Sequence, residues 1–536
     1  MTEGDPQSIG EFDYVIVGAG SAGCVLANRL SEDPSVTVCL LEAGGKDKDP
    51  LIHIPMGFPF VPSWTPDNWR FETVPQKHLN GRNGYQPRGR VLGGSSSVNA
   101  MIYIRGTKAD YDRWAADGMP DWSYENVLPY FRKAEDNTRG EDGHHGVAGP
   151  LGVSDLRFKN PLSDVFLEAA AQLQFPATDD FNRERQDGFG YYQVTQRDGR
   201  RCSTAKGYLE PAASRENLEV VTNAQAKKVT FDNGRASGVL FGDRKSTRRV
   251  NARSEVILSA GAFQSPQLLL LSGIGPGDDL REHSIEVVAE RNGVGKNLQD
   301  HIDWSALYKC ASPHSIGINF GTIAGFLSAV SAYRKRGEGY LSSNIAECGG
   351  FLKTDPSEDE PDVQLIFLPA LVDDHGRKKH IGGGVSCHAC VLRPKSRGDV
   401  RLINPDPLGA PRIDPQFLSD EYDLERLLRG ARIVHRVFSA PAFEGMLGNS
   451  IYAGREATDD ELIEDIRNRA DTIYHPVGTC RMGADDEAVV DPHLRVNGVN
   501  GLRVVDASIM PYLISGNTNA PVIMIAEKAA DMIKAG

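Results

Sequence analysis

The strongest constraint on the fold is a glycine-rich turn that follows a short apolar run near the N-terminus. Residues 14–17 read Tyr-Val-Ile-Val, a composition typical of a buried parallel strand. The turn carries Gly18, Gly20 and Gly23 in GxGxxG spacing. In a strand–turn–helix unit, the first glycine permits the tight turn, the second admits a pyrophosphate, and the third lets helix and strand pack closely. The turn therefore predicts a Rossmann-like α/β unit that binds a dinucleotide.

The residues after the turn extend this prediction. Residues 24–30 have helical spacing of apolar side chains, and a helix that begins near Ser21 would direct its free N–H groups at the phosphates. A second strand over 36–41 ends in Glu42, 19 residues past Gly23. An acid there accepts hydrogen bonds from the adenosine ribose and repels a 2′-phosphate, which disfavours NADP. The motif alone does not separate NAD from FAD.

Length, charge and cysteine usage exclude several other classes. A chain of 536 residues exceeds what one core usually serves, so we expect two domains. A net charge of −13 argues against a nucleic-acid partner. No secretory leader, and no apolar run of about 20 residues, is evident in the sequence. The cysteines are too sparse for a disulfide scaffold, and Cys387 and Cys390 are interpreted as structural, so no metal is expected. A reducing cytoplasm is the expected location.

Several later segments resemble one flavoprotein family. Residues 89–99 (GRVLGGSSSVN) are similar to its first signature, and residues 261–275 (GAFQSPQLLLLSGIG) are similar to its second. Residues 295–301 (GKNLQDH), 474–480 (YHPVGTC) and 505–508 (VDAS) follow in the family's order. On these motifs the chain is identified as a member of the glucose–methanol–choline (GMC) flavoprotein oxidoreductases. It most resembles their choline, alkanol and polyethylene glycol dehydrogenase branch.

The resemblance implies FAD and a two-domain fold. It implies a discontinuous Rossmann-like FAD-binding domain and an α+β substrate domain with an antiparallel sheet and flanking helices. We expect the FAD-binding domain to comprise residues 1–154, 215–305 and 466–536. The substrate domain is then expected to comprise residues 155–214 and 306–465.

The motif and the resemblance together predict the cofactor contacts. Val229 would contact the adenine through its backbone, and Asp506 and Ala507 would approach the ribityl chain and pyrophosphate. Val98 stands where some relatives carry a histidine bonded covalently to the flavin, so we expect non-covalent FAD. The predicted cofactor-binding residues are Gly18, Gly20, Ser21, Ala22, Gly23, Glu42, Ala43, Val91, Gly94, Ser95, Asn99, Ala100, Met101, Ile102, Val229, Tyr474, Asp506, Ala507, Asn519 and Ala520.

Alcohol oxidation requires a base near the hydroxyl, because an alkoxide donates hydride far better than the alcohol does. Histidine suits this role, since its pKa lies near working pH. The resemblance assigns the base to His475 and the second member of the catalytic pair to Asn519, whose amide would hold the substrate oxygen. His301 is interpreted as structural, near the domain junction. His144 and His145, in a Gly/Asp-rich loop, are interpreted as solvated.

The leading interpretation is an FAD-dependent dehydrogenase that oxidises a primary alcohol and passes electrons to a quinone or another acceptor. An oxidase that forms hydrogen peroxide, a hydroxynitrile lyase with structural FAD, and a non-catalytic flavin scaffold are the alternatives. An apolar cavity lining favours an aliphatic, ether or aromatic tail over choline or a free sugar. The residues expected to form that lining are Leu51, Ile54, Met56, Phe58, Phe60, Phe320, Phe326 and Phe367.

Membrane contact is a further open point. Residues 320–333 are apolar and run into Arg334, Lys335 and Arg336, a pattern that resembles an interfacial helix. The same segment could form a lid over the substrate cavity, and we favour the lid. The expected location is therefore cytoplasmic, with peripheral contact to the inner face of the membrane left open.

Overall fold

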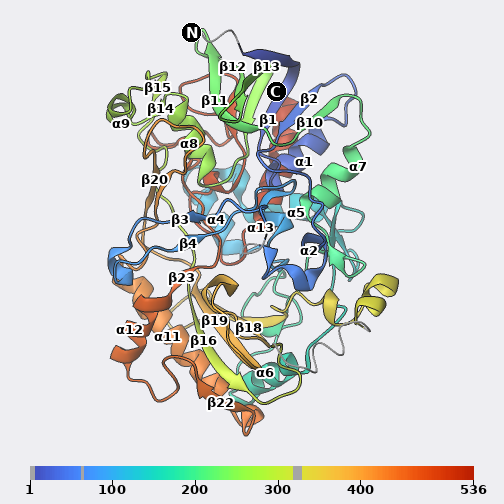
Figure 1. Ribbon diagram of the computed structural model, residues 1–536, viewed down its shortest axis with the longest axis vertical. Coiled ribbons are helices and arrows are strands. Elements are labelled where there is room, and N and C mark those ends of the chain that lie inside the picture. The colour runs from blue at the N-terminus through green and yellow to red at the C-terminus, as the bar shows by residue number, and fades with distance from the viewer. Residues whose placement is uncertain (1–5, 62–64, 318–328) are drawn as a thin grey trace.

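Two seven-stranded sheets, one above the other in Figure 1, organise the described part of the chain. The computed structural model describes residues 6–61, 65–317 and 329–536. The upper sheet runs β10-β2-β1-β13-β12-β11, with β24 beside β13. Its strands are β1 (Gln7–Val17), β2 (Val38–Leu41), β10 (Leu218–Val221), β11 (Gln225–Asp232), β12 (Arg235–Gly242), β13 (Thr247–Leu258) and β24 (Leu502–Val504).

The upper sheet is parallel at its centre and antiparallel at one side. β1 pairs in parallel with β2 and β13, whereas β12 pairs antiparallel with β11 and β13. The alternation over 218–258 predicts one meander, and this is wrong for β10, which pairs in parallel with β2. Residues 205–212, which precede β10, are helical. Parallel strands need such a crossover connection, and β10 therefore joins the sheet beside β2 in the parallel direction.

The two ends of the chain meet on this sheet. α13 (Asn519–Ala535) packs between α1 (Ser21–Leu30) and α5 (Tyr124–Ala134). Buried Glu527 accepts hydrogen bonds from Arg29 Nε at 2.9 Å and Nη2 at 2.8 Å, and from the Tyr208 hydroxyl at 2.8 Å. A bidentate pair of this kind fixes geometry as well as distance. The C-terminal helix is therefore held against the helix that follows the glycine-rich turn.

The lower sheet is antiparallel and carries helices on one face. Its order is β22-β16-β19-β18-β17-β7, with β23 beside β16. α6 (Pro161–Gln172) and α11 (Glu421–Phe438) contact it, and α12 (Asp459–Arg469) packs against α11. The strands are β7 (Gly188–Tyr191), β16 (Ile302–Cys310), β17 (Cys348–Leu352), β18 (Val363–Leu368), β19 (Gly384–Val391), β22 (Leu447–Ser450) and β23 (Asp471–Thr472).

The remaining elements connect and cover the sheets. The sequence predicts helices over 424–438, 459–469 and 520–534, and α11, α12 and α13 occupy those stretches. The helix expected over 320–333 falls largely outside the described residues, although residues 329–336 are helical. Among the described residues, no helix is both long and apolar enough to cross a membrane. Further elements are α2 (Pro50–His53), β3 (Phe71–Glu72), β4 (Tyr85–Gln86), α4 (Lys108–Ala116), β5 (Glu135–Asn137), β6 (Leu151–Val153), α7 (Glu210–Ala212), α8 (Gln264–Leu271), α9 (Gly277–Glu282), β20 (Asp399–Arg401) and β21 (Arg412–Asp414).

The loop with adjacent histidines holds a buried charge network rather than solvated side chains. His145 is fully buried, and its ring contacts Asp180 Oδ2 at 2.8 Å and Glu135 Oε1 at 3.1 Å. Arg105 also donates to Glu135. Burial opposes a charge on His145, but the hydrogen bonds to Asp180 and Glu135 outweigh it and raise its pKa to about 9. The solvated interpretation of His145 is therefore wrong, because the ring is buried between these two carboxylates.

Removing the carboxylate at the centre of this network should destabilise the fold strongly. Glu135→Ala leaves Arg105 and His145 buried without their shared partner, so the free energy of unfolding should fall by about 3–5 kcal/mol. Urea denaturation of the protein measures this change. Glu141→Ala removes an exposed partner of Arg132 and is the control, expected to cost at most about 1 kcal/mol. Equal effects of the two substitutions would contradict the role given to Glu135.

Candidate active site

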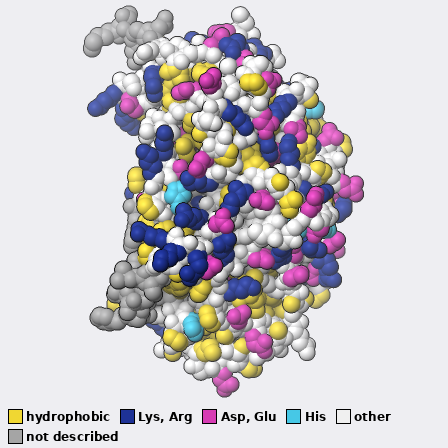
Figure 2. Space-filling view, turned by 90° about the vertical axis from the view of Figure 1, so that its right-hand side faces the viewer, with side chains coloured by type: hydrophobic (Ala, Val, Ile, Leu, Met, Phe, Trp, Pro, Cys, Tyr) yellow, Lys and Arg dark blue, Asp and Glu magenta, His cyan; other side chains and the backbone are white. Residues whose placement is uncertain are grey.

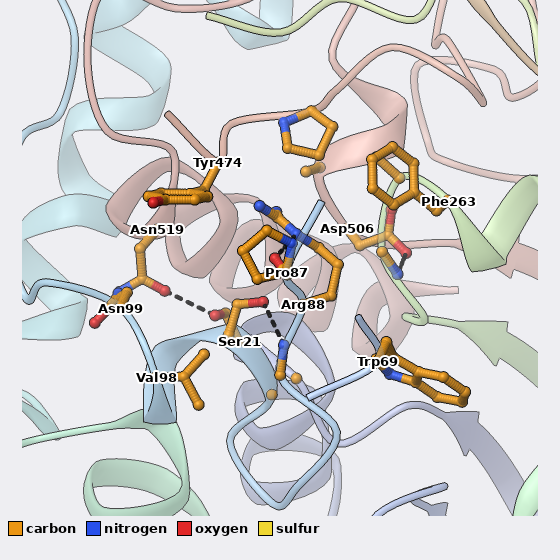
Figure 3. Close-up of a pocket in the computed structure, with 18 of the residues that line it drawn as sticks. Ser21, Trp69, Pro87, Arg88, Val98, Asn99, Phe263, Tyr474, Asp506 and Asn519 are labelled. Carbon is orange, nitrogen blue, oxygen red and sulfur yellow. Dashed lines mark hydrogen bonds between the residues drawn. The ribbon is translucent and has the colours of Figure 1, made fainter. Parts of the chain in front are cut away.

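A cavity between the two sheets collects most of the predicted cofactor residues, as Figure 3 shows for part of its wall. Tyr474 and Asn519 lie on one side of the view, and Phe263 and Asp506 lie on the other. The predicted residues that line the cavity are Gly18, Gly20, Ser21, Ala22, Glu42, Ala43, Gly94, Ser95, Asn99, Ala100, Met101, Ile102, Tyr474, Asp506, Ala507 and Asn519. Val98 lines it as well.

Four predicted cofactor residues do not line this cavity. Val91 and Ala520 are buried away from it, and Gly23 serves packing, because a Cβ there would lie 1.9 Å from the Gly18 carbonyl oxygen. The prediction for Val229 is corrected, since its N–H already donates to Ser272 Oγ at 2.9 Å. Residues 224–226 line the cavity instead. A bulge between 226 and 228 shifts the strand register, which no pattern of alternation reveals.

The glycine-rich turns bring two backbones into contact at the cavity. Gly94 has φ +52°, and a Cβ on it would lie 2.6 Å from the Cα of Gly20. The first turn of α1 receives no side-chain cap from the described residues, so the N–H groups near Ser21 stay free for an anion. Such a cradle fits the pyrophosphate of a dinucleotide. A side chain at either glycine would fill it.

Glu42 is held where an adenosine ribose is expected. Its Oε2 accepts from the Ala19 N–H at 2.9 Å, and its Oε1 accepts from the Gly44 N–H at 2.8 Å. Burial raises the pKa of Glu42 to about 7. Because the backbone fixes the carboxyl group at the end of β2, a ribose hydroxyl would meet it in a single orientation. The donors and glycines of the cavity thus fit FAD.

His475 is positioned by a strained turn after β23. Its backbone N–H donates to Asp300 Oδ1 at 2.9 Å, and the Thr472 hydroxyl donates to Asp300 Oδ2 at 2.6 Å. Tyr474 has φ +78°, which is rare for a bulky residue and persists only where neighbours impose it. Burial raises the pKa of Asp300 to about 6. Asp300 therefore ties the turn to the loop that leads into β16.

His301 contacts the ring of His475. This contact determines which nitrogen of His475 carries the proton. His301 Nε2 lies 3.0 Å from the Leu392 carbonyl oxygen, which can only accept, so Nε2 carries the hydrogen of neutral His301. His301 Nδ1 is then an acceptor, and it lies 2.9 Å from His475 Nδ1. His475 consequently donates from Nδ1 and keeps a lone pair on Nε2. The structural interpretation of His301 misses this contact, because the two residues lie 174 positions apart.

The amide beside His475 is Asn517 and not Asn519. Asn517 Nδ2 lies 3.2 Å from His475 Nε2, and Asn517 Oδ1 accepts from Gln364 Nε2 at 3.4 Å. Asn519 Oδ1 instead accepts from the Ser21 hydroxyl at 2.7 Å, as Figure 3 shows. Asn519 begins α13, so its side chain turns toward the start of α1. The predicted partner of the base is corrected to Asn517, which precedes the helix.

The surroundings of His475 keep it uncharged. Burial is the main cause that holds its pKa well below the usual value of 6.5, and the electrostatic interactions with the His301 ring and with the Arg88 guanidinium act in the same direction. Arg88 lines the cavity, and burial lowers its own pKa to about 10. At neutral pH the ring of His475 is therefore neutral, with the Nε2 lone pair next to Asn517. This is the form that a general base requires.

The apolar wall beside the base differs in part from the expected lining. Phe58 lines the cavity as predicted, and β18 contributes Ile366 and Leu368. Phe367 points away and stacks on Phe166 with ring centroids 4.6 Å apart, because alternate residues of a strand face opposite sides. Phe320 and Phe326 lie outside the described residues. The other expected residues line a separate cavity: Leu51, Ile54, Met56 and Phe60.

Comparison with known proteins assigns the family. Two models described as GMC oxidoreductase match residues 12–303 and 394–526. The chain belongs to the GMC oxidoreductase family. It is 48% identical to "Alcohol dehydrogenase [acceptor]" of Pseudomonas putida, over 97% of this chain and 95% of that protein. It is 44% identical to "Choline dehydrogenase, mitochondrial" of Homo sapiens, over 98% of this chain and 90% of that one.

Solved structures agree with this assignment. A formate oxidase from Aspergillus oryzae RIB40, studied for modification of its FAD, superposes with a TM-score of 0.92 at 27% identity and covers 99% of each chain. As a GMC oxidoreductase, the protein is a flavoprotein with FAD as its cofactor, and it oxidises alcohols. The glycine-rich cradle, Glu42 and the wall formed by residues 94–102 are the parts of this chain that would hold FAD.

Substituting Asn517 and Asn519 one at a time should show that one affects the reaction and the other affects cofactor binding. Asn517→Ala should keep FAD and lower the rate of flavin reduction by an alcohol about 10²-fold, because a donor at the reacting oxygen is lost. Asn519→Ala should lower the FAD content per chain, since Ser21 loses its partner at the start of α1. Flavin absorbance of the purified variants and rapid anaerobic mixing measure the two effects. A normal reduction rate in Asn517→Ala would contradict its assignment.

Proposed function

We propose that the protein oxidises a primary alcohol with an aliphatic, ether or aromatic tail to the aldehyde, and passes the electrons to a quinone or a similar acceptor. The observation that carries the proposal is the neutral His475, whose Nε2 lone pair lies beside the Asn517 amide at the cavity. A base and a hydrogen-bond donor at one point suit a hydroxyl group, which must lose a proton while its oxygen is held.

The roles of the residues follow from these contacts. Bound FAD supplies the two-electron acceptor for the hydride of the carbinol carbon. His475 Nε2 takes the hydroxyl proton, and the hydrogen bond from its Nδ1 to His301 keeps the ring in the required tautomer and orientation. Asn517 Nδ2 donates to the oxygen as negative charge develops there. The positive charge of Arg88 in the cavity wall favours that charge further.

The charges at the cavity favour an uncharged alcohol over choline. Glu42 and Asp506 are the carboxylates among the described lining residues. Glu42 accepts from two backbone N–H groups, and Asp506 accepts from the Gly261 N–H at 2.8 Å and from the Ser265 hydroxyl at 2.5 Å. Both carboxylates are thus already engaged by donors of this chain. Phe58, Ile366 and Leu368 offer an apolar tail a matching surface.

Loss of the base should stop the reductive reaction without releasing FAD. His475→Ala should slow flavin reduction by a saturating primary alcohol by about 10²- to 10⁴-fold, because the group proposed to take the hydroxyl proton is lost. Anaerobic stopped-flow absorbance of the flavin measures the rate. His493→Ala, at an exposed histidine, is the control and should reduce at the parent rate. A reduction rate that survives in His475→Ala would sink the assignment.

The pH dependence should reflect the lowered pKa of His475. A base acts in its deprotonated form, and a pKa below 6.5 means that this form persists throughout neutral pH. Flavin reduction should stay constant from about pH 7 to about pH 9 and decline only as acid pH approaches the lowered pKa. Stopped-flow rates at saturating alcohol across this range test the expectation. A rate that is already half lost at pH 7 would contradict it.

A further inference from the structure

A second cavity opens on the side of the molecule that carries α2 and α7, where Figure 2 shows Lys and Arg side chains gathered among hydrophobic ones. The described residues give it an apolar wall and a basic rim. The apolar residues are Leu51, Ile54, Met56, Phe60, Val330, Tyr333 and Leu341, and the basic residues are Lys48, His53, Arg197, Arg200, Arg201, Lys206 and Arg334. Glu210 is the acid among the described lining residues, and Lys206 pairs with it at 2.7 Å.

Arg201 is the unusual member of this lining, because it is buried without a carboxylate partner in the described part of the chain. Its side chain is 3% exposed. Nε donates to the Ile52 carbonyl at 2.6 Å, and Nη1 donates to the Ser96 carbonyl at 3.1 Å. Nη2 is buried and has no hydrogen-bond partner among the described residues. An orphaned buried donor destabilises the protein, and a ligand oxygen that accepts from Nη2 would remove that cost.

The second cavity shares a wall with the FAD cavity. Arg201 Nη1 also donates to Asn99 Oδ1 at 2.8 Å, and Asn99 lines the FAD cavity. Leu51 of the second cavity and Val98 of the first pack against the same buried cluster of Ile52, Val61 and Val91. Residues 96–99 therefore lie between the two spaces. A molecule bound against Arg201 would be close to the cofactor without entering the substrate cavity.

The lining of this cavity favours a ligand that has an oxygen able to accept a hydrogen bond and is otherwise apolar. The guanidinium of Arg201 is a hydrogen-bond donor with an unpaired positive charge, and Lys48, Arg200 and Arg334 form no ion pair with the described residues. Positive charge stabilises a ligand on which negative charge builds up. The aliphatic and aromatic wall meanwhile suits a flat ring with an apolar tail.

We propose that the second cavity binds the electron acceptor, and that this acceptor is a quinone whose carbonyl oxygen accepts from Arg201 Nη2. The proposal rests on the proposed function, which supplies the electrons. Oxidation of the alcohol breaks one C–H and one O–H bond and releases two electrons and two protons. Reduction of the quinone consumes all four, because each of its two carbonyl oxygens gains an O–H bond. Alcohol and quinone then occupy separate cavities.

Binding of a short-chain benzoquinone to the oxidised FAD-bound protein provides the test. Val330→Trp fills the cavity from the 329–336 helix, and Ser331→Trp adds the same side chain at the next, exposed position outside the lining. Calorimetric titration should show the quinone dissociation constant raised about tenfold or more in Val330→Trp, a loss of about 1.4 kcal/mol. Ser331→Trp should bind like the parent. Arg201→Lys, which removes Nη2 but keeps the charge, should also weaken binding, with FAD content verifying that it folds.

Rapid mixing separates this proposal from the proposed function. Flavin reduction by the alcohol and reoxidation by phenazine methosulfate should remain at parent rates in Val330→Trp, while reoxidation by the quinone slows. Quinone binding and reoxidation that are equal in Val330→Trp and Ser331→Trp would overturn the acceptor site. Absence of flavin reduction by any primary alcohol in the parent would overturn the proposed function instead, and the calorimetric result would still report on the cavity.

Discussion

The site depends on the hydrogen bonds by which Asp300 and His301 orient His475. These two residues directly precede β16 of the antiparallel sheet. Asp300 fixes the backbone of His475, and His301 fixes its ring, each through a hydrogen bond of 2.9 Å. A base held by both backbone and ring has a defined orientation before substrate arrives. That orientation supports the role of base that we propose for His475.

Burial gives this arrangement its electrostatic consequence. Removing the imidazole from water disfavours its charged form, and the nearby guanidinium of Arg88 adds to the effect. The result is a neutral imidazole beside a positive wall, which is the combination that the proposed removal of a hydroxyl proton needs. The hydrogen bonds between Arg29 and Glu527 hold the C-terminal helix against the helix that follows the glycine-rich turn. The cofactor-binding turn and His475 thus come from opposite ends of the sequence.

Local patterns in the sequence predict part of this site, and long-range contacts decide the rest. Gly20 and His475, the predicted base, belong to short motifs whose chemistry can be interpreted residue by residue. Asn517 could not be distinguished from Asn519, because only the start of α13 decides which amide faces the base. Phe367 looks like cavity lining until the pleat of β18 turns it toward the opposite face. His145 looks solvated because its partners come from distant segments. In each case the missing information is three-dimensional.

The protonation of His475 is the most direct test of its proposed role as the base. Neutron diffraction from crystals of the FAD-bound protein at neutral pH locates the deuterons on both imidazole rings. We expect a deuteron on His475 Nδ1, directed at His301, and none on Nε2. We also expect a deuteron on His301 Nε2, directed at the Leu392 carbonyl. A deuteron on Nε2 of His475 would contradict the proposed role, since that nitrogen could not accept the proton of an alcohol.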